Sequence, residues 1–174
     1  MTNIHSSVVI GKGTRIEPTA VIQEGCEIGD NCFIGHYNVM RPRTKIGNRT
    51  MVGHLCVFEG ETSVGDDCVI QSQCHITKGA IIEDKVFFGP GTMGINDLKM
   101  THLRHGDNPF VPNAFKVLRG ARVATGVLIA PGVTIGRNAV IGMGSIVMKD
   151  VMDNEIVYGT RAQVKNVVPE DERL

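Results

Sequence analysis

The sequence predicts an all-β protein, a parallel β-solenoid that coils through most of the 174 residues. Every sixth residue from Ile4 to Phe88 is Ile, Val, Met or Phe, and the same frame resumes at Val117 and runs to Val147. The residue four places after each of these is small or β-branched except Asn38, which either points inward or marks a bulge. A period of six fits neither an α-helix nor a plain alternating strand, and short fixed repeats are typical of solenoids.

The predicted turn of the solenoid is 18 residues long, or three hexads, which gives about seven turns. Opposite charges recur at this spacing, as expected of neighbours on stacked strands. The pairs are Arg41 with Glu59, Arg43 with Glu61, and Glu27 with Lys45. Asp and Asn also recur every 18 residues, and both suit tight corners because they tolerate left-handed backbone angles. This column consists of Asp30, Asn48, Asp66 and Asp84.

The repeat breaks once, at residues 94–116, where no hexad pattern holds. A long irregular segment inside a compact domain is usually functional or disordered, and a rigid scaffold on both sides favours function. After Val147 the chain leaves the solenoid, and we expect residues 153–174 to cap the final turn and end in a short helical turn. Residues 1–174 therefore form a single domain.

Composition excludes several functions. A net charge of zero and a pI near 7 argue against binding nucleic acid or a membrane through electrostatic attraction. The sequence contains no apolar run long enough to span a bilayer and no signal pattern, so we expect a cytoplasmic protein. All five cysteines occupy the small repeat position, which predicts buried, reduced thiols.

Several segments resemble the hexapeptide-repeat acyltransferases, whose fold is a left-handed parallel β-helix. They are IGDNCFIG, VGDDCVIQ, FFGPGTM and, above all, VLIAPGVTIGRNAVIGMGSIVMKDV followed by IVYGT. The left-handed coil is implied only by this resemblance, since the general rule for parallel crossovers predicts right-handed coils. Within the family, the segment VIQSQCHITKGAIIEDKVFFGPGTMGIND is most similar to N-acetyltransferases that act on nucleotide-linked amino sugars for surface polysaccharides.

The resemblance implies acetyl-CoA as co-substrate and a homotrimer with sites between subunits, each covered by the loop of one chain. It places the pantetheine arm near Ala124–Thr125 and Gly142–Met143, and the nucleotide phosphates near Lys149, Arg161 and Lys165. Two positions depart from the family pattern: Gln73 replaces an Asn proposed to act in the site of relatives, and Leu98 to His102 replace a Pro-Arg pair. These departures bear on the substrate more than on the reaction.

Three histidines are candidates for the catalytic base, because a neutral imidazole accepts a proton near physiological pH. His102 and His105 lie in the interrupting segment, whereas His75 lies on the solenoid near the point where that segment begins. The family match assigns substrate contacts to Gln73, Asn96 and Asp97. Each could also be an ordinary surface or turn residue.

Three other functions stay open. The first is an O-acetyltransferase that uses a loop histidine as base, and the second is a metalloenzyme like the γ-class carbonic anhydrases, because His36 and His54 stack one turn apart. That class has two histidines five residues apart, a spacing absent here, so we expect no metal and interpret the pair as a polar corner ladder. The third is a scaffold without catalytic activity.

Overall fold

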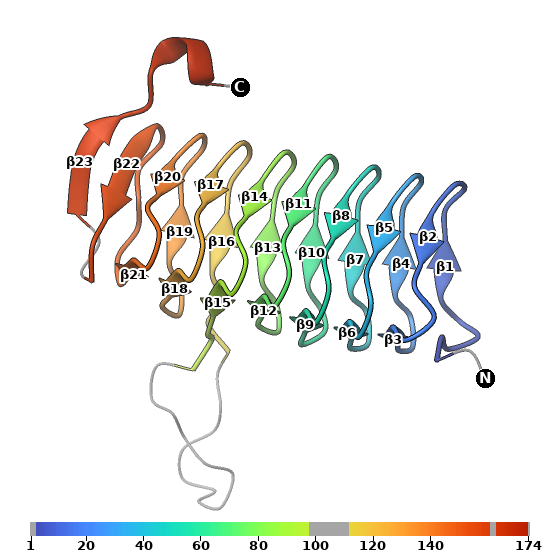
Figure 1. Ribbon diagram of the computed structural model, residues 1–174. Coiled ribbons are helices and arrows are strands. Elements are labelled where there is room, and N and C mark those ends of the chain that lie inside the picture. The colour runs from blue at the N-terminus through green and yellow to red at the C-terminus, as the bar shows by residue number, and fades with distance from the viewer. Residues whose placement is uncertain (1–2, 98–111, 161–162, 174) are drawn as a thin grey trace, which may run out of the picture.

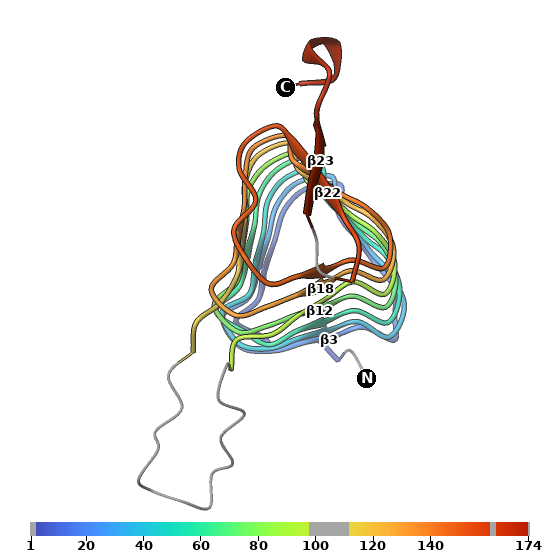
Figure 2. The ribbon, with the colours of Figure 1, turned by 90° about the vertical axis from the view of Figure 1, so that its left-hand side faces the viewer.

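The computed structural model describes residues 3–97, 112–160 and 163–173, and they form the predicted left-handed β-solenoid with a triangular cross-section (Figures 1 and 2). Strands β1 to β21 are two residues long and repeat in threes, one on each face of the prism. Successive turns pair as parallel strands exactly one 18-residue turn apart up to Met93, for example Glu27 with Lys45. The 18-residue turn read from the charge ladders is therefore confirmed.

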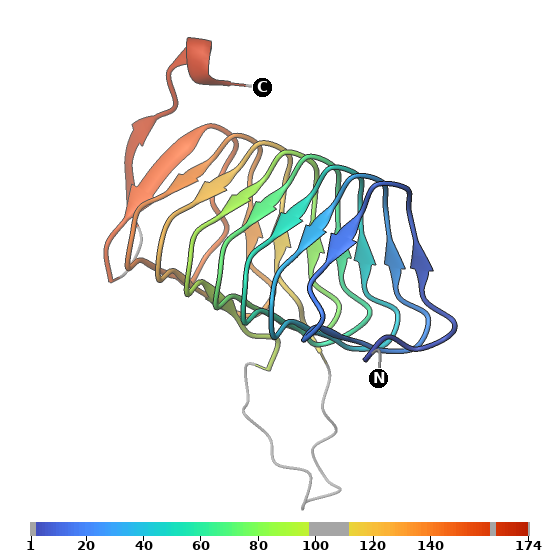
Figure 3. The ribbon, with the colours of Figure 1, turned by 45° about the vertical axis from the view of Figure 1, so that its right-hand side comes forward.

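Face 1 contains β1 (Val9–Ile10), β4 (Glu27–Ile28), β7 (Lys45–Ile46), β10 (Ser63–Val64), β13 (Ile81–Ile82), β16 (Lys116–Val117) and β19 (Thr134–Ile135). Face 2 contains β2 (Arg15–Ile16), β5 (Phe33–Ile34), β8 (Met51–Val52), β11 (Val69–Ile70), β14 (Phe87–Phe88), β17 (Arg122–Val123), β20 (Val140–Ile141), β22 (Glu155–Tyr158) and β23 (Gln163–Val167). Face 3 contains β3 (Val21–Ile22), β6 (Val39–Met40), β9 (Val57–Phe58), β12 (His75–Ile76), β15 (Met93–Gly94), β18 (Leu128–Ile129) and β21 (Ile146–Val147). Figure 3 shows the strands side by side along the prism.

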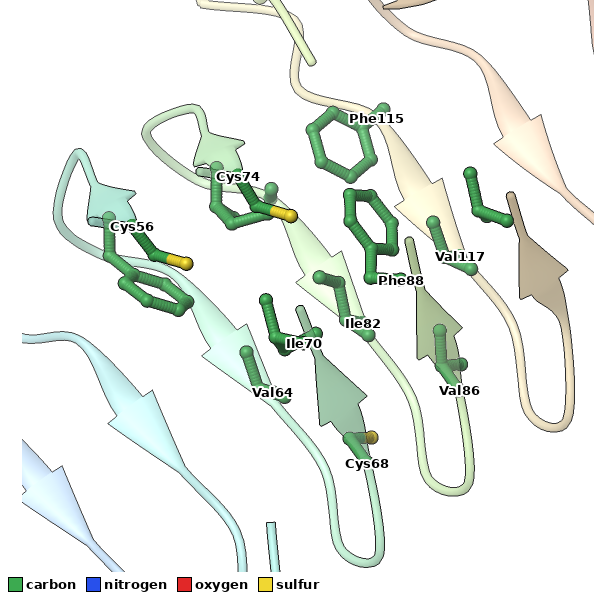
Figure 4. Close-up of a cluster of buried hydrophobic side chains, with 14 of the residues drawn as sticks. Cys56, Val64, Cys68, Ile70, Cys74, Ile82, Val86, Phe88, Phe115 and Val117 are labelled. Atoms are coloured by element: carbon green, nitrogen blue, oxygen red, sulfur yellow. The ribbon is translucent and has the colours of Figure 1, made fainter. Parts of the chain in front are cut away.

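The hexad explains the core. In β1 to β21 the second residue of each strand, apart from Gly94 of β15, is the apolar hexad position and points inward, where stacked apolar side chains fill the prism (Figure 4). The small residues lie at the corners, where the interior is narrow. Asn38 points inward: its Nδ2 donates to the carbonyls of Gly35 and Gly53 at 2.7 Å each, and its Oδ1 accepts the Cys56 amide at 2.8 Å. The five cysteines are buried free thiols, as predicted.

Side chains at the corners tie successive turns together. Asp66 Oδ1 accepts the backbone N–H of Asn48 at 2.8 Å, and Asp84 Oδ1 accepts that of Asp66 at 2.9 Å. These bonds satisfy backbone donors that a tight corner leaves unpaired. The predicted ion pairs also form, with Arg41 and Glu59 at 2.5 Å and Lys45 and Glu27 at 2.9 Å.

The interruption is shorter than predicted. Gly94 ends β15 and Lys116 begins β16, so both ends of the predicted loop 94–116 belong to strands. Phe115 is fully buried between them, where its ring stacks on Phe88 with centroids 6.2 Å apart. The loop emerges from the corner between faces 3 and 1 (Figure 3).

The C-terminal segment follows the prediction of a cap. Strand β22 pairs with β20 in parallel, β23 returns antiparallel to β22, and a single 3-10 turn, η1 (Glu170–Glu172), follows. Val157 is buried, so β22 covers apolar surface at this end of the prism, whereas β23 is exposed and η1 projects beyond the prism (Figures 1 and 2). Within the described residues, no helix is long and apolar enough to cross a membrane.

Candidate functional site

The outward side chains distinguish face 3 from face 1. The first residue of each strand points outward, and on face 3 these residues are Val21, Val39, Val57, His75, Met93, Leu128 and Ile146. Face 1 instead presents Glu27, Lys45, Ser63, Lys116 and Thr134 among its outward residues. Among the described strands of face 3, His75 is the one polar outward residue, so its imidazole stands in an apolar ladder.

An apolar pocket lies on the C-terminal half of face 3. Its volume is about 420 Å³, and it reaches the corner where the loop begins. The lining residues are Met93, Ile95, Asp97, Leu128, Ile129, Ala130, Pro131, Ile146 and Met148. Among these described residues, Asp97 carries the one ionisable side chain. Pockets of this size and composition are typical of small-molecule sites.

His75 lies beside this pocket. Its strand partners are Val57 on one side and Met93 on the other, so its Cα lies about 4.8 Å from that of Met93, which lines the pocket. The side chain is partly buried. His75 therefore stands one strand away from the pocket, beside its lining residue Met93.

A strip of bare backbone follows the other edge of face 3, at the corner with face 2. One position of this corner has a left-handed backbone in six successive turns. It is Tyr37, Leu55 and Gln73 at φ 59–63°, then Gly91, Gly126 and Gly144 at φ 65–69°. A Cβ added at any of the three glycines would meet no heavy atom of the described chain within 4 Å. Tyr, Leu and Gln adopt the same φ, so the backbone does not require glycine at this position. The three glycines therefore leave a path along the corner that no side chain of this position covers.

The residues predicted to hold the pantetheine arm line this strip. Ala124–Thr125 precede Gly126, and Gly142–Met143 precede Gly144, so the structure brings them onto one edge with Gln73. The backbone stacks tightly here, because a Cβ on Gly89 would lie 2.5 Å from the Ala124 carbonyl carbon. Met143 is 79 % exposed and Gln73 is also exposed, so both side chains are free to meet a ligand.

Asn96, Asp97 and Lys149 lie on the opposite edge of face 3, at the corner with face 1. Asn96 Nδ2 donates to the Lys78 carbonyl at 3.1 Å, and the Asn96 carbonyl accepts the Asn113 amide at 2.9 Å. Asn96 therefore closes the base of the loop, whereas Asp97 reaches the pocket. His102, His105 and Arg161 lie outside the described residues.

Those predicted site residues that the structure describes thus fall on both edges of face 3, with His75 between them. Sequence reasoning missed the pocket residues Met93, Leu128, Ile146 and Met148. The sequence signal for them is weak, because outward apolar residues also occur on the other two faces, for example Phe33 and Ile81. It also missed the glycine strip, which appears in the sequence as Gly three places after Phe88, Val123 and Ile141.

His36 and His54 stack as predicted, with ring centroids 5.6 Å apart and 17° between planes. His54 Nδ1 accepts the His36 backbone N–H at 2.8 Å, the same bond that Asp makes at other corners. Thr19 Oγ1 lies 2.9 Å from His36 Nδ1. No group of three or more potential metal ligands gathers anywhere in the described chain. The pair is a corner ladder.

The five cysteines are buried inside the prism. Burial raises the pKa of the Cys68 thiol to about 11, and it also raises the pKa of Cys26. The thiols of Cys56 and Cys74 share a hydrogen bond. This bond is the main cause that raises the pKa of Cys74, with burial as the second cause, and the same bond lowers the pKa of Cys56. Because all these thiols lie inside the prism, they pack and do not face the pocket.

Comparisons with known proteins agree with this architecture. The family described as bacterial transferase hexapeptide (six repeats) matches residues 7–42 and 43–78, and the family described as hexapeptide repeat of succinyl-transferase matches residues 117–149. Together these matches cover more than half of the chain. No curated protein matches the sequence.

Solved structures share the fold. A hexapeptide-repeat acetyltransferase of Vibrio cholerae in complex with acetyl coenzyme A is 21 % identical with a TM-score of 0.58, covering 76 % of this chain and 72 % of that one. The N-acyltransferase AntD of Bacillus cereus, in complex with dTDP and coenzyme A, is 18 % identical with a TM-score of 0.59, covering 94 % and 85 %. The polysialic-acid-specific acetyltransferase NeuO is 17 % identical with a TM-score of 0.65, covering 92 % and 81 %.

Proposed function

Because this chain belongs to the bacterial hexapeptide-repeat transferases, we propose that it transfers an acetyl group from acetyl-CoA to the amino group of a nucleotide-linked amino sugar. The observation that carries the proposal is the bare strip of Gly91, Gly126 and Gly144 beside a face that holds a single outward histidine. The fold neighbours solved with acetyl coenzyme A, and with dTDP and coenzyme A, support the two classes of substrate.

The strip suits the pantetheine arm of coenzyme A. The arm carries two amide groups on a narrow chain, so it needs backbone partners and no protruding side chains. Stacked turns repeat at about 4.8 Å, so the same backbone groups recur at regular steps along the corner. The amides of Gly91, Gly126 and Gly144 already donate to the preceding turn, so the N–H groups of the arm would pair with corner carbonyls, each of which has two lone pairs. In this proposal Ala124, Thr125, Gly142 and Met143 flank the arm, and its thiol end reaches the neighbourhood of Gln73 and His75.

His75 is the proposed general base. The lone pair of the neutral acceptor amine attacks the thioester carbonyl carbon, and the tetrahedral oxyanion collapses with cleavage of the C–S bond. His75 takes the proton that the amine nitrogen loses and returns it to the departing coenzyme A thiolate. An amine is already a good nucleophile when neutral, so positioning the two substrates supplies much of the rate. In this proposal His102 and His105 act from the loop, as part of the cover over the site.

The nucleotide sugar is proposed to lie above face 3 and outside the apolar pocket, with Gln73, Asn96 and Asp97 near the sugar and the basic residues Lys149 and Arg161 near the phosphates. We also propose a homotrimer with sites between subunits. The N-terminal half of face 3 supports it, because the outward Val21, Val39 and Val57 form a continuous apolar ladder, and large apolar patches commonly mark protein contacts.

Calorimetry with acetyl-CoA, followed by a screen of acetyl transfer to UDP- and dTDP-linked amino sugars, tests the proposal. We expect saturable binding of acetyl-CoA and release of free thiol with at least one amino sugar, but not with the corresponding sugar that carries a hydroxyl at the same carbon. If acetyl-CoA does not bind, the transferase is excluded. Transfer to the hydroxyl sugar instead would establish O-acetylation.

A further inference from the structure

The pocket on face 3 is larger and less polar than an acetyl group needs. A water molecule occupies about 30 Å³ of liquid, so the pocket of about 420 Å³ has room for roughly a dozen atoms of that size. Met93, Leu128, Ile95 and Met148 expose 45–57 % of their surface around it. Burying this surface under a hydrocarbon is favourable, whereas an acetyl methyl would leave most of it in water.

The chemistry of the wall limits what can fill it. Sugars, phosphates and the pantetheine arm all carry many hydrogen-bonding groups, and such groups lose free energy when they are buried without partners. Among the described lining residues, the side chains of Met93, Leu128, Ile146 and Met148 offer no conventional donor, and Asp97 offers a carboxylate only at the edge. An aliphatic chain is the ligand that fits such a wall.

The position of the pocket connects it to the reaction. Met93 is the strand neighbour of His75 on β12, and Leu128 and Ile146 continue the same ladder away from it. A thioester carbonyl beside His75 would therefore point its acyl chain along the ladder into the pocket. The flexible thioethers of Met93 and Met148 can adapt to chains of different shape.

We infer that this pocket binds the acyl chain of the donor, so that the protein binds and transfers acyl groups longer than acetyl. The inference rests on the proposed function, in which acetyl-CoA is the shortest of the accepted donors. Each methylene placed in the pocket strengthens donor binding until the pocket is full.

Unreactive S-alkyl analogues of the donor test whether the pocket binds the acyl chain. S-ethyl-, S-butyl- and S-hexyl-coenzyme A are titrated by calorimetry against the full-length protein. We expect the dissociation constant to fall about fourfold for each added methylene. Leu128→Trp should fill the pocket and weaken S-hexyl-coenzyme A strongly while leaving S-ethyl-coenzyme A nearly unchanged. Ile81→Trp is the matched control, because Ile81 is an outward residue of face 1 with 42 % exposure against 45 % for Leu128.

The possible results of these titrations distinguish a failure of the acyl-chain pocket from a failure of the proposed transferase function. Equal affinity for all three thioethers, or a length dependence that survives Leu128→Trp, would overturn the chain site and leave the acetyltransferase in place. Equal affinity is also the result expected if a second copy of the protein fills this pocket. Failure of every thioether to bind would overturn the proposed function itself. Native mass spectrometry of Leu128→Trp shows whether the substitution changes assembly, but the wild-type length series decides the inference without it.

Discussion

Phe115 occupies the space that a side chain at Gly94 would need. A Cβ on Gly94 would lie 1.9 Å from Phe115 Cε1. Gly94 holds the inward strand position, paired with Ile129, where other turns have Ile, Val, Met or Phe. Phe115 holds the corner position, where other turns have small residues: its carbonyl accepts the Ile81 amide just as the Ala80 carbonyl accepts the Ser63 amide. The large and small positions are thus exchanged where the chain leaves and re-enters the solenoid.

This exchange predicts a compensating pair of substitutions. Phe115→Ala should lower the free energy of unfolding by about 3–5 kcal/mol, because it leaves a cavity against Phe88. Gly94→Ile should also be strongly destabilising, since the new side chain collides with the ring. The double variant restores the ordinary hexad and should be more stable than either single variant. Urea denaturation of all four proteins measures the coupling, and additive losses would show that the two positions are independent.

The same pair shows what the sequence could predict. The hexads predicted the faces, the core and the 18-residue register, because in a solenoid each turn contacts mainly its neighbours and sequence spacing becomes geometry. The hexads did not predict that Gly94 still belongs to the repeat. A glycine at the inward apolar position looks like the end of the repeat, because the compensating Phe115 lies 21 residues later.

The candidate site was predicted less completely than the fold. Gln73, Ala124, Thr125, Gly142 and Met143 became candidates only through the family resemblance, and the structure places them on one edge. The pocket could not be predicted in the same way, because an outward Leu128 or Ile146 looks like any other apolar residue until the neighbouring turns define a concave surface. The residues of the loop, including His102 and His105, carry no repeat from which a position follows.

The corner residue Asp66 predicts a dependence of stability on pH. The backbone N–H of Asn48 donates a hydrogen bond to the Asp66 carboxylate, and this bond is the main reason why the pKa of Asp66 lies below its usual range. A carboxyl whose folded pKa is depressed stabilises the fold above its unfolded pKa, near 3.8, and this contribution is lost as pH falls through the folded value. Asp66→Asn keeps an Oδ1 acceptor, as Asn48 does naturally in the same column, but it cannot titrate. Its unfolding free energy should therefore fall less between pH 5 and about 2.5 than that of the wild type. Parallel urea titrations measure the difference, and equal losses would exclude Asp66 as a contributor.

The glycine strip predicts a selective effect on coenzyme A binding. Gly126→Leu copies Leu55, which occupies the same corner position at φ 60°, so the backbone has a precedent for it. The added side chain should block the strip and weaken acetyl-CoA binding more than tenfold. Gly25→Leu is the matched control: Gly25 has φ 66°, its Cβ would meet only Arg43 Cγ at 3.5 Å, and it lies on the corner between faces 3 and 1 in the N-terminal half.

Both glycine variants should lose a similar amount of stability, about 1 kcal/mol, because both introduce a side chain at a left-handed position. Calorimetry and thermal denaturation together separate binding from folding. Equal acetyl-CoA affinity in the two variants would place the pantetheine arm elsewhere on the molecule.

Replacement of His75 should lower the reaction rate without unfolding the protein. His75→Gln keeps a polar side chain of similar length in the outward ladder but removes the base, so kcat should fall by about 10²- to 10⁴-fold while acetyl-CoA affinity changes little. Imidazole, or a higher pH that deprotonates more of the acceptor amine, should restore part of the rate. His54→Gln is the control, because His54 is another histidine of the solenoid but is exposed and lies at the corner of an earlier turn. The measurement is the pH profile of kcat for the three proteins. A His75→Gln enzyme with the wild-type profile would exclude His75 as the base and leave the two loop histidines, His102 and His105, as the remaining candidates.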